Sequence, residues 1–263
     1  MYQQELLYGH NSFAITAVLF VLIILFNEVG FQIGRFVQNR TDSEVKELTG
    51  SVQASILGLL ALLLGFTFSM SMQRYDDRNQ ALIEEANAIG TASLRVQLLP
   101  ARYQQPMSEL LRQYVDLRVS LGEIDLSRHA ERSRYNARIK RLQGELWALA
   151  VQATNDDPRP VTSGAFVSAL NQMIDSQGQR HAQLQMHVPE VVLLLLFVVF
   201  IASVGILGYS SGLSGKRIVV PTVLVSLLIA LIVFIIIDLD RPKRGLIQVD
   251  QGIMQELQQR PQG

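Results

Sequence analysis

Four polar side chains recur at helical spacing where a long apolar stretch gives way to charged residues: Thr67, Ser71, Arg74 and Arg78. Steps of four, three and four residues place them in one narrow sector of a helix, which Leu60 and Leu64 continue into the apolar stretch. Arginines at a pore mouth concentrate anions, hydroxyl groups replace the hydrogen bonds of hydration, and leucines form an apolar constriction. We therefore predict that these six residues line a pore for an inorganic anion such as chloride.

A simpler interpretation stays open for the two arginines. Arg74 and Arg78 lie where a helix leaves the bilayer, and arginines at that depth anchor a helix whether or not it conducts. The acidic residues of this region alternate with the arginines, as on a solvated helix face, and they are Asp76, Asp77, Glu84 and Glu85. One helix cannot supply the converging oxygens that a hard cation needs, so we expect no metal site there.

The other side of the same segment carries small residues at Ala54, Gly58, Ala61 and Gly65. At about 100° per residue they lie roughly 150° from the polar sector. Small side chains let a second helix approach closely, so we predict that this face packs against another helix. The partner is a helix of the same chain or of a neighbouring subunit, and the sequence leaves both open.

Glu28 and Gln32 form a second polar group, one helical turn apart near the end of the first apolar segment. A carboxylate inside the bilayer is costly, so we expect this intramembrane pair to face other helices or water. A cluster whose side chains reach the headgroups is favoured over a proton or ion site.

Other chemistry is not indicated by the sequence. It contains no Gly-rich phosphate loop, no nucleophile elbow and no His-Glu-x-x-His motif, so we predict neither an enzyme nor a cofactor. Cysteine is absent, and the four histidines do not share a helix face, which argues against a metal site. The formal net charge of +0 argues against nucleic-acid binding.

Membrane helices are the elements that must position these residues. Hydrophobic residues make up 49% and charged residues 17% of the 263-residue chain, with a mean hydropathy of +0.23. Four apolar segments are long enough to cross a hydrocarbon core of about 30 Å: residues 13–34, 52–72, 188–209 and 218–237. Residues 73–78 contain neither Gly nor Pro, so we expect the second helix to continue past the membrane surface and to end before Pro100.

Between the second and third spans the sequence predicts a soluble helical bundle. Two apolar stripes form a predicted hairpin with its turn at residues 122–127, and a further helix begins near Val161 and runs toward the membrane. The stripes comprise Met107, Leu110, Tyr114, Leu117 and Leu121, then Tyr135, Ile139, Leu142, Leu146 and Leu149, then Phe166, Leu170, Met173, Gln177, His181 and Leu184. The predicted fold is an all-α integral membrane protein with four transmembrane helices and a helical-bundle soluble domain built on extensions of the second and third spans.

The predicted organisation has four parts. Residues 1–72 hold the first two transmembrane helices, 73–187 the soluble bundle, 188–238 the last two transmembrane helices, and 239–263 a basic amphipathic tail. The tail either lies along the headgroups or returns to the bundle. Four spans place both termini and the bundle on one side. The amino terminus lacks Lys and Arg, whereas Arg241, Lys243 and Arg244 favour a cytoplasmic bundle, which we adopt.

Several motifs resemble the bestrophin-like domain family of bacterial and plant membrane proteins. They are Leu-Leu-Leu-Gly-Phe-Thr-Phe-Ser-Met at 62–70, Arg74-Tyr75, the run from Glu84 to Thr91, Leu98-Leu99-Pro100, and the closing run from Asp238 to Ile247. The resemblance implies a multi-pass protein of the bacterial inner membrane and, through bestrophins, a homo-oligomeric anion channel, a pentamer, whose second helix lines the pore. The acidic run of the bestrophin calcium clasp has no counterpart in this sequence.

Two functions follow from these observations. The first is an oligomeric, anion-permeable ion channel in the lipid membrane, with the second transmembrane helix around the axis. The alternative is a non-conducting sensor or adaptor whose bundle binds a ligand or a protein partner. Conductance in liposomes under a chloride gradient distinguishes them.

Overall fold

The computed structural model describes residues 11–123, 129–217, 219–241 and 245–259, which form helices and short links, with no strand in these ranges. The chain divides into two compact units. The membrane unit consists of Met1–Arg74, His187–Arg241 and Gly245–Ile247, and the bundle unit of Tyr75–Met186, Pro242–Arg244 and Gln248–Gly263. The protein is thus all-α.

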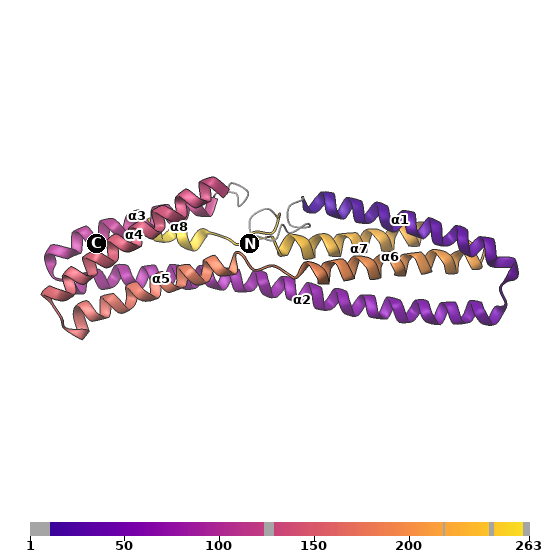
Figure 1. The fold of residues 1–263 in the computed structure, drawn as a ribbon, viewed down its shortest axis with the longest axis horizontal. Coiled ribbons are helices and arrows are strands. Elements are labelled where there is room, and N and C mark those ends of the chain that lie inside the picture. Colours follow the sequence, from indigo (N-terminus) through magenta and orange to yellow (C-terminus); the bar gives the residue numbers. More distant parts are fainter. Residues whose placement is uncertain (1–10, 124–128, 218, 242–244, 260–263) are drawn as a thin grey trace. The chain divides into compact units, whose positions relative to one another are not determined.

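Four helices of the structure are long and apolar enough to cross a membrane (Figure 1). They are α1 (Ser12–Val37), α2 (Ser43–Arg95), α6 (Glu190–Leu213) and α7 (Val219–Leu239), and a 3-10 turn (Gln38–Arg40) joins the first two. All four agree with the segments predicted from the apolar runs. Ile218, the expected first residue of the fourth span, lies outside the described residues.

In the membrane unit, α1 and α6 pack backbone against backbone. A Cβ added at Gly30 would overlap the carbonyl oxygen of Gly205, and one at Gly208 would overlap the carbonyl oxygen of Asn27. Asn27 also donates a hydrogen bond from Nδ2 to the carbonyl of Val204, at 3.2 Å. Lipid chains are as apolar as leucine, so helices in a bilayer associate through such close contacts between small residues.

The first part of α2 joins the membrane unit through a single side of the helix. Leu60 is 3% exposed and shares an apolar cluster with Ile23 of α1, Phe200 of α6 and Val233 of α7. One buried leucine of α2 therefore belongs to a cluster to which all three other membrane helices contribute.

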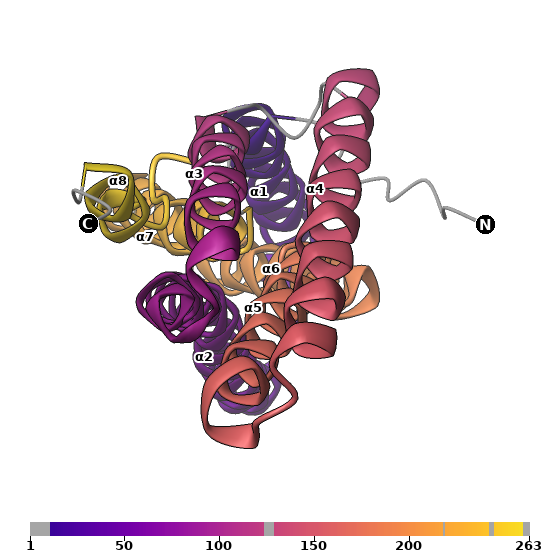
Figure 2. The same ribbon diagram turned by 90° about the vertical axis from the view of Figure 1, so that its left-hand side faces the viewer.

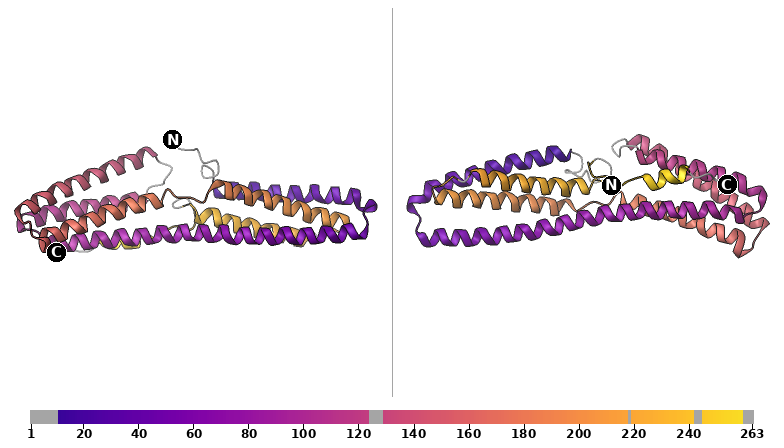
Figure 3. Two further views of the ribbon diagram at one scale, coloured as in Figure 1. Left: turned by 60° about the horizontal axis from the view of Figure 1, so that its bottom comes forward. Right: turned by 180° about the vertical axis from the view of Figure 1, so that it is seen from behind.

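The two links between membrane helix and bundle helix differ. On one link, α2 continues as one helix of 53 residues, about 80 Å at 1.5 Å per residue (Figure 3). On the other, α5 ends at Gln183 and α6 begins at Glu190, so the expected helix running toward the membrane is interrupted. Pro189 explains the break, because a proline disfavours helical geometry in the residue before it.

Buried acidic residues at the end of α7 hold this interrupted link within the membrane unit. The amide of Val188 donates to Oδ2 of Asp240 at 2.9 Å, and Nδ1 of His187 lies 3.1 Å from the Asp240 carbonyl oxygen. Asp238 accepts a hydrogen bond from the amide of Ile247 at 2.8 Å. Both aspartates are 1% exposed, so backbone amides replace the water that their carboxylates lose.

The bundle unit is built from the second half of α2 and the helices that follow it (Figure 2). These are α3 (Ala101–Glu123), α4 (His129–Asp156), α5 (Ala165–Gln183) and α8 (Gly252–Gln259), with short helical turns at Val96–Leu98 and Pro160–Gly164. The expected hairpin turn largely lies outside the described residues.

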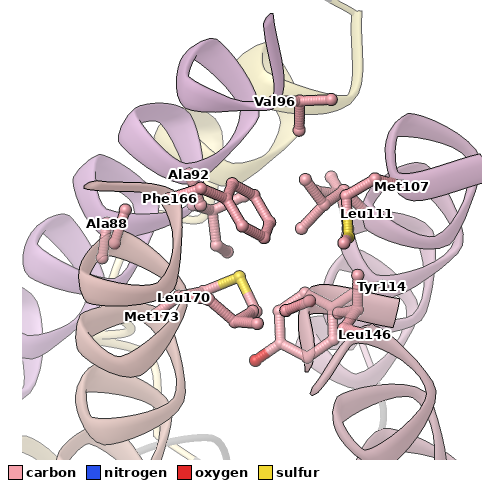
Figure 4. Close-up of a cluster of buried hydrophobic side chains, with 14 of the residues drawn as sticks. Ala88, Ala92, Val96, Met107, Leu111, Tyr114, Leu146, Phe166, Leu170 and Met173 are labelled. Carbon is pink, nitrogen blue, oxygen red and sulfur yellow. The ribbon is translucent and has the colours of Figure 1, made fainter. Parts of the chain in front are cut away.

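The apolar stripes predicted for the bundle meet in one core, which Figure 4 shows in part. Met107, Tyr114, Leu146 and Phe166 are each 0% exposed. Met254 of α8 is also 0% exposed and joins this core. The described tail is therefore not a separate segment, because residues 245–247 pack with the membrane unit and 248–259 with the bundle. Lys243 and Arg244, which we expected at the headgroups, lie outside the described residues.

Candidate functional site

The membrane part of α2 leaves a continuous side of the helix exposed. Five exposed residues step by four, three, four and three along it: Ser55, Leu59, Leu62, Phe66 and Ser69. Their directions fall within a sector of roughly 80° at about 100° per residue. Leu59, Leu62 and Phe66 are 50%, 55% and 61% exposed. We call these five residues the exposed stripe; it places three large apolar side chains between two hydroxyl groups.

The small-residue face of α2 is also exposed in the part of the chain that the structure describes. Ala54, Gly58, Ala61 and Gly65 are exposed, and a Cβ added at either glycine would meet no atom within 4 Å. The described helices of the membrane unit thus leave this face uncovered. Contact with a neighbouring subunit stays a prediction.

The sector predicted to line a pore lies mostly inside the chain. Leu60, Thr67, Ser71 and Arg78 are buried, and Leu64 and Arg74 are partly buried. Our prediction rested on the poor fit of hydroxyl groups to lipid, but the Thr67 hydroxyl donates to the Leu63 carbonyl at 2.7 Å. That bond within the helix satisfies the hydroxyl without water, so the polar side chain does not require a lumen.

Glu28 and Gln32 come together as expected, and they have a partner that the sequence did not indicate. Gln32 Nε2 donates to Glu28 Oε1 at 3.0 Å, and Nη2 of Arg217, from the α6–α7 link, lies 2.5 Å from the same oxygen. The Arg217 and Glu28 side chains are 55% and 43% exposed. A half-exposed ion pair with a loop arginine fits an interfacial cluster.

One buried ionic group in the bundle unit was not predicted. Glu85 of α2 is 0% exposed and pairs with Arg118 of α3 and Arg180 of α5, each 5% exposed. We had interpreted Glu85 as part of a solvated acidic face. A signal against that interpretation was present, because Glu85 lies three residues after Leu82 and four before Ile89, on the apolar side of the helix.

Metal ligands do not gather in the part of the chain that the structure describes, since no group of three or more His, Asp or Glu side chains there could hold an ion.

Comparisons with known proteins agree with the architecture. The sequence profile of the Bestrophin-like domain matches residues 20–253. Three point-mutant crystal structures of a bacterial bestrophin homologue from Klebsiella pneumoniae are similar in fold. At 16%, 15% and 16% identity they give TM-scores of 0.63, 0.62 and 0.61, covering 92%, 91% and 90% of this chain and 95%, 94% and 96% of theirs. No curated protein matches the sequence.

Proposed function

The chain belongs to the Bestrophin-like domain family and is a membrane protein, and from this premise we propose that it forms a homo-oligomeric channel for small inorganic anions such as chloride, with α2 around the axis. The observation that carries the proposal is the exposed stripe of α2. We further propose that the channel resides in the bacterial inner membrane with the bundle unit in the cytoplasm.

The exposed stripe would face the lumen of such a channel. Ser69 offers a hydroxyl group at one end of it, where an anion exchanges hydration for protein contacts, whereas the Ser55 hydroxyl at the other end donates to the Ser51 carbonyl at 3.0 Å. Between them, Leu59, Leu62 and Phe66 would form an apolar constriction that closes by dewetting. We therefore assign the lumen to this stripe and not to the buried sector around Leu60 and Thr67.

The small-residue face would then contact the neighbouring subunit. At about 100° per residue, its centre lies roughly 90° around α2 from the exposed stripe. A helix in a ring turns one side to the axis and the adjoining sides to its neighbours, so this angle is compatible with a ring. Exposed glycines at Gly58 and Gly65 would let the neighbouring helix approach closely.

Anion preference would come from charge near the end of the exposed stripe. Arg74 is partly exposed and follows Ser69 by five residues, at the end of the membrane part of α2. A ring of such residues raises the local anion concentration, and the effect weakens with added salt.

Substitutions on the two sides of α2 test the assignment of the lumen. In liposomes, Phe66→Ala and Leu62→Ala should raise basal chloride conductance by widening the constriction. Leu60→Ala is the matched control, because a buried leucine that is truncated should lower the yield of folded protein without changing single-channel conductance. A larger conductance for Leu60→Ala or Leu64→Ala, with the conductance of Phe66→Ala unchanged, would mean that the lumen is lined by the sector around Leu60 and Thr67.

Selectivity provides a second readout from the same preparation. Ser69→Glu should shift the reversal potential toward cations, and Arg74→Glu should shift it in the same direction by less. If neither substitution changes the reversal potential, the channel does not select anions at the Ser69 end of the exposed stripe. If the wild type conducts at no tested voltage, pH or calcium level, the sensor or adaptor function replaces the channel.

A further inference from the structure

A groove of about 580 Å³ lies between α1 and α6 in the membrane unit, within the size range of sites that hold a small molecule. The residues that line it include Val29, Gly30 and Ile33 of α1 and Val198, Gly205 and Ile206 of α6. The two glycines add no side chain to the space. Val29, Ile33 and Val198 are 44%, 53% and 63% exposed, so the groove opens toward the lipid.

The groove has the length of one leaflet of a bilayer. Along α6 it runs from Val198 to Tyr209, about 16 Å at 1.5 Å per residue, which is roughly half of a hydrocarbon core of about 30 Å. A membrane helix of a partner would cross both leaflets, whereas a lipid acyl chain occupies one. The lining side chains are apolar except for Tyr209, whose amphipathic ring suits the end nearest the headgroups.

Both helices of the groove end at the same face of the membrane. An added Cβ at Gly208 of α6 would overlap the backbone of Asn27, and one at Gly212 would overlap the backbone of Phe31. Residues further along α6 thus lie against residues further along α1, so the two helices run in the same direction. The groove lies toward the end where α1 passes into the turn Gln38–Arg40 and α6 into its link to α7.

Two basic side chains follow the helices at this face. The side chain of Gln38 lies against Gly215, and Arg40 and Lys216 come two residues and one residue later in their segments. Both basic residues are exposed, and in the part of the chain that the structure describes neither forms an ion pair, not even with the nearby Asp42. Basic residues at the headgroup level attract anionic lipids, so the charge here favours a negative headgroup.

We infer that the groove between α1 and α6 binds one acyl chain of an anionic phospholipid, whose phosphate-bearing headgroup is held by Arg40 and Lys216. The apolar walls contact the chain, and the two basic residues select negative over zwitterionic headgroups. The site lies on α1 and α6 and not on α2, so it does not depend on whether the protein conducts.

Native mass spectrometry of the purified full chain tests the headgroup preference, with phosphatidylglycerol and phosphatidylcholine of the same acyl composition added in turn. One phosphatidylglycerol should bind per subunit, more tightly than phosphatidylcholine. Arg40→Gln and Lys216→Gln should each raise the half-saturating phosphatidylglycerol concentration about fivefold. Arg35→Gln is the matched control, because this exposed arginine leaves α1 on roughly the opposite side from Val29 and Ile33 and should change nothing.

Filling the groove tests where the acyl chain lies. An added Cβ at Gly205 would meet only the Phe26 carbonyl oxygen, at 3.9 Å, so Gly205→Leu should occupy the groove without displacing α1 and should abolish the tight binding. Ala202→Leu, at an exposed position of the same groove, should do the same and serves if the first variant does not fold. Ala17→Leu adds the same side chain at an exposed position of α1 outside the groove and should leave binding unchanged.

A phosphatidylglycerol with a photoreactive group in its acyl chain gives a readout on the wild type in liposomes. Crosslinks are expected on the parts of α1 and α6 that line the groove. Equal binding of the two lipids, or wild-type binding by folded Gly205→Leu and Ala202→Leu, would overturn the inference. Crosslinks confined to other helices would overturn it as well, and so would loss of assembly in Ala202→Leu with the groove unlabelled, because a neighbouring subunit would then fill the groove.

Discussion

The hydroxyl groups of the membrane helices and the buried charges of the bundle unit find their hydrogen-bond partners differently. In the membrane unit, the hydroxyls of Thr67, Ser203 and Ser226 each donate to a carbonyl four residues earlier in their own helix. In the bundle unit, Glu85, Arg118 and Arg180 come from three helices that lie far apart in the sequence. A hydroxyl group in lipid can be satisfied by its own helix, whereas a bundle can use buried charges to fix how its helices meet.

The two units also differ in the side chains through which their helices pack. Glycines bring the α1 and α6 backbones together, but the bundle core is filled by large side chains such as Phe166 and Leu146. The hydrophobic effect drives the second arrangement and is largely absent between helices in a bilayer. The two units should therefore fail for different reasons when they are mutated.

The largest effect is expected at the α1–α6 contact. Gly208→Leu places a side chain where the Asn27 backbone lies, so the two helices must separate and folded protein should be lost. Gly65→Leu is the matched control, because nothing lies within 4 Å of its added Cβ. That variant should fold and instead lose assembly, seen as a smaller particle on size exclusion. Gly58→Leu should behave like Gly65→Leu, and normal elution of both would count against a subunit contact at this face.

A smaller loss is expected in the bundle core. Phe166→Ala removes a fully buried ring and should cost about 3–5 kcal/mol of unfolding free energy, through lost burial and the cavity left behind. Trp147→Ala changes a larger side chain that is 39% exposed and should cost clearly less. Chemical denaturation followed by circular dichroism measures both, and equal losses would mean that the bundle core does not limit stability.

The smallest effect concerns the link between α4 and α5 and depends on pH. Arg159 and Thr162 donate to the Asp157 carboxylate at 2.7 and 2.6 Å and hold its pKa well below the ordinary range. A carboxylate with a lowered pKa stabilises the fold above its unfolded pKa, near 4, and that contribution fades as the pH falls. Asp157→Asn should therefore lower the thermal midpoint at pH 7 and lower it by less at pH 3, where part of the contribution is already lost. The same loss at both values would contradict a role for the charge.

The spacing of apolar residues was sufficient to predict the helices, but it did not predict which helices pack against each other. The apolar stripes predicted α3, α4 and α5 because each stripe belongs to one helix and needs no knowledge of its neighbour. The α1–α6 contact was missed, although Gly30 and Gly34 have the same spacing of four that we noted in α2. Small residues become a contact only when a second helix lies opposite, and the sequence does not say which helix that is.

For the two sides of α2, too, the sequence did not predict which side packs against the other helices. Spacing separates the small residues near Gly58 from the sector around Leu60 and Thr67, because the angle between residues is fixed by the helix. Which side turns inward depends on the other three membrane helices, and Leu60 shares an apolar cluster with Phe200 and Val233 from distant parts of the chain. The outward direction of Phe66 follows from this cluster and could not be obtained from α2 alone.

The uninterrupted course of α2 also constrains how this protein can change over evolution. Inside the bundle unit, Leu82, Glu85 and Ile89 are buried on one side of α2, at steps of three and four residues. Adding or removing one residue between Glu85 and Ile89 would turn the carboxylate by about 100° relative to the apolar residues that follow it. We therefore expect relatives to keep the length of α2 between these residues, while the link between α5 and α6 accepts single insertions.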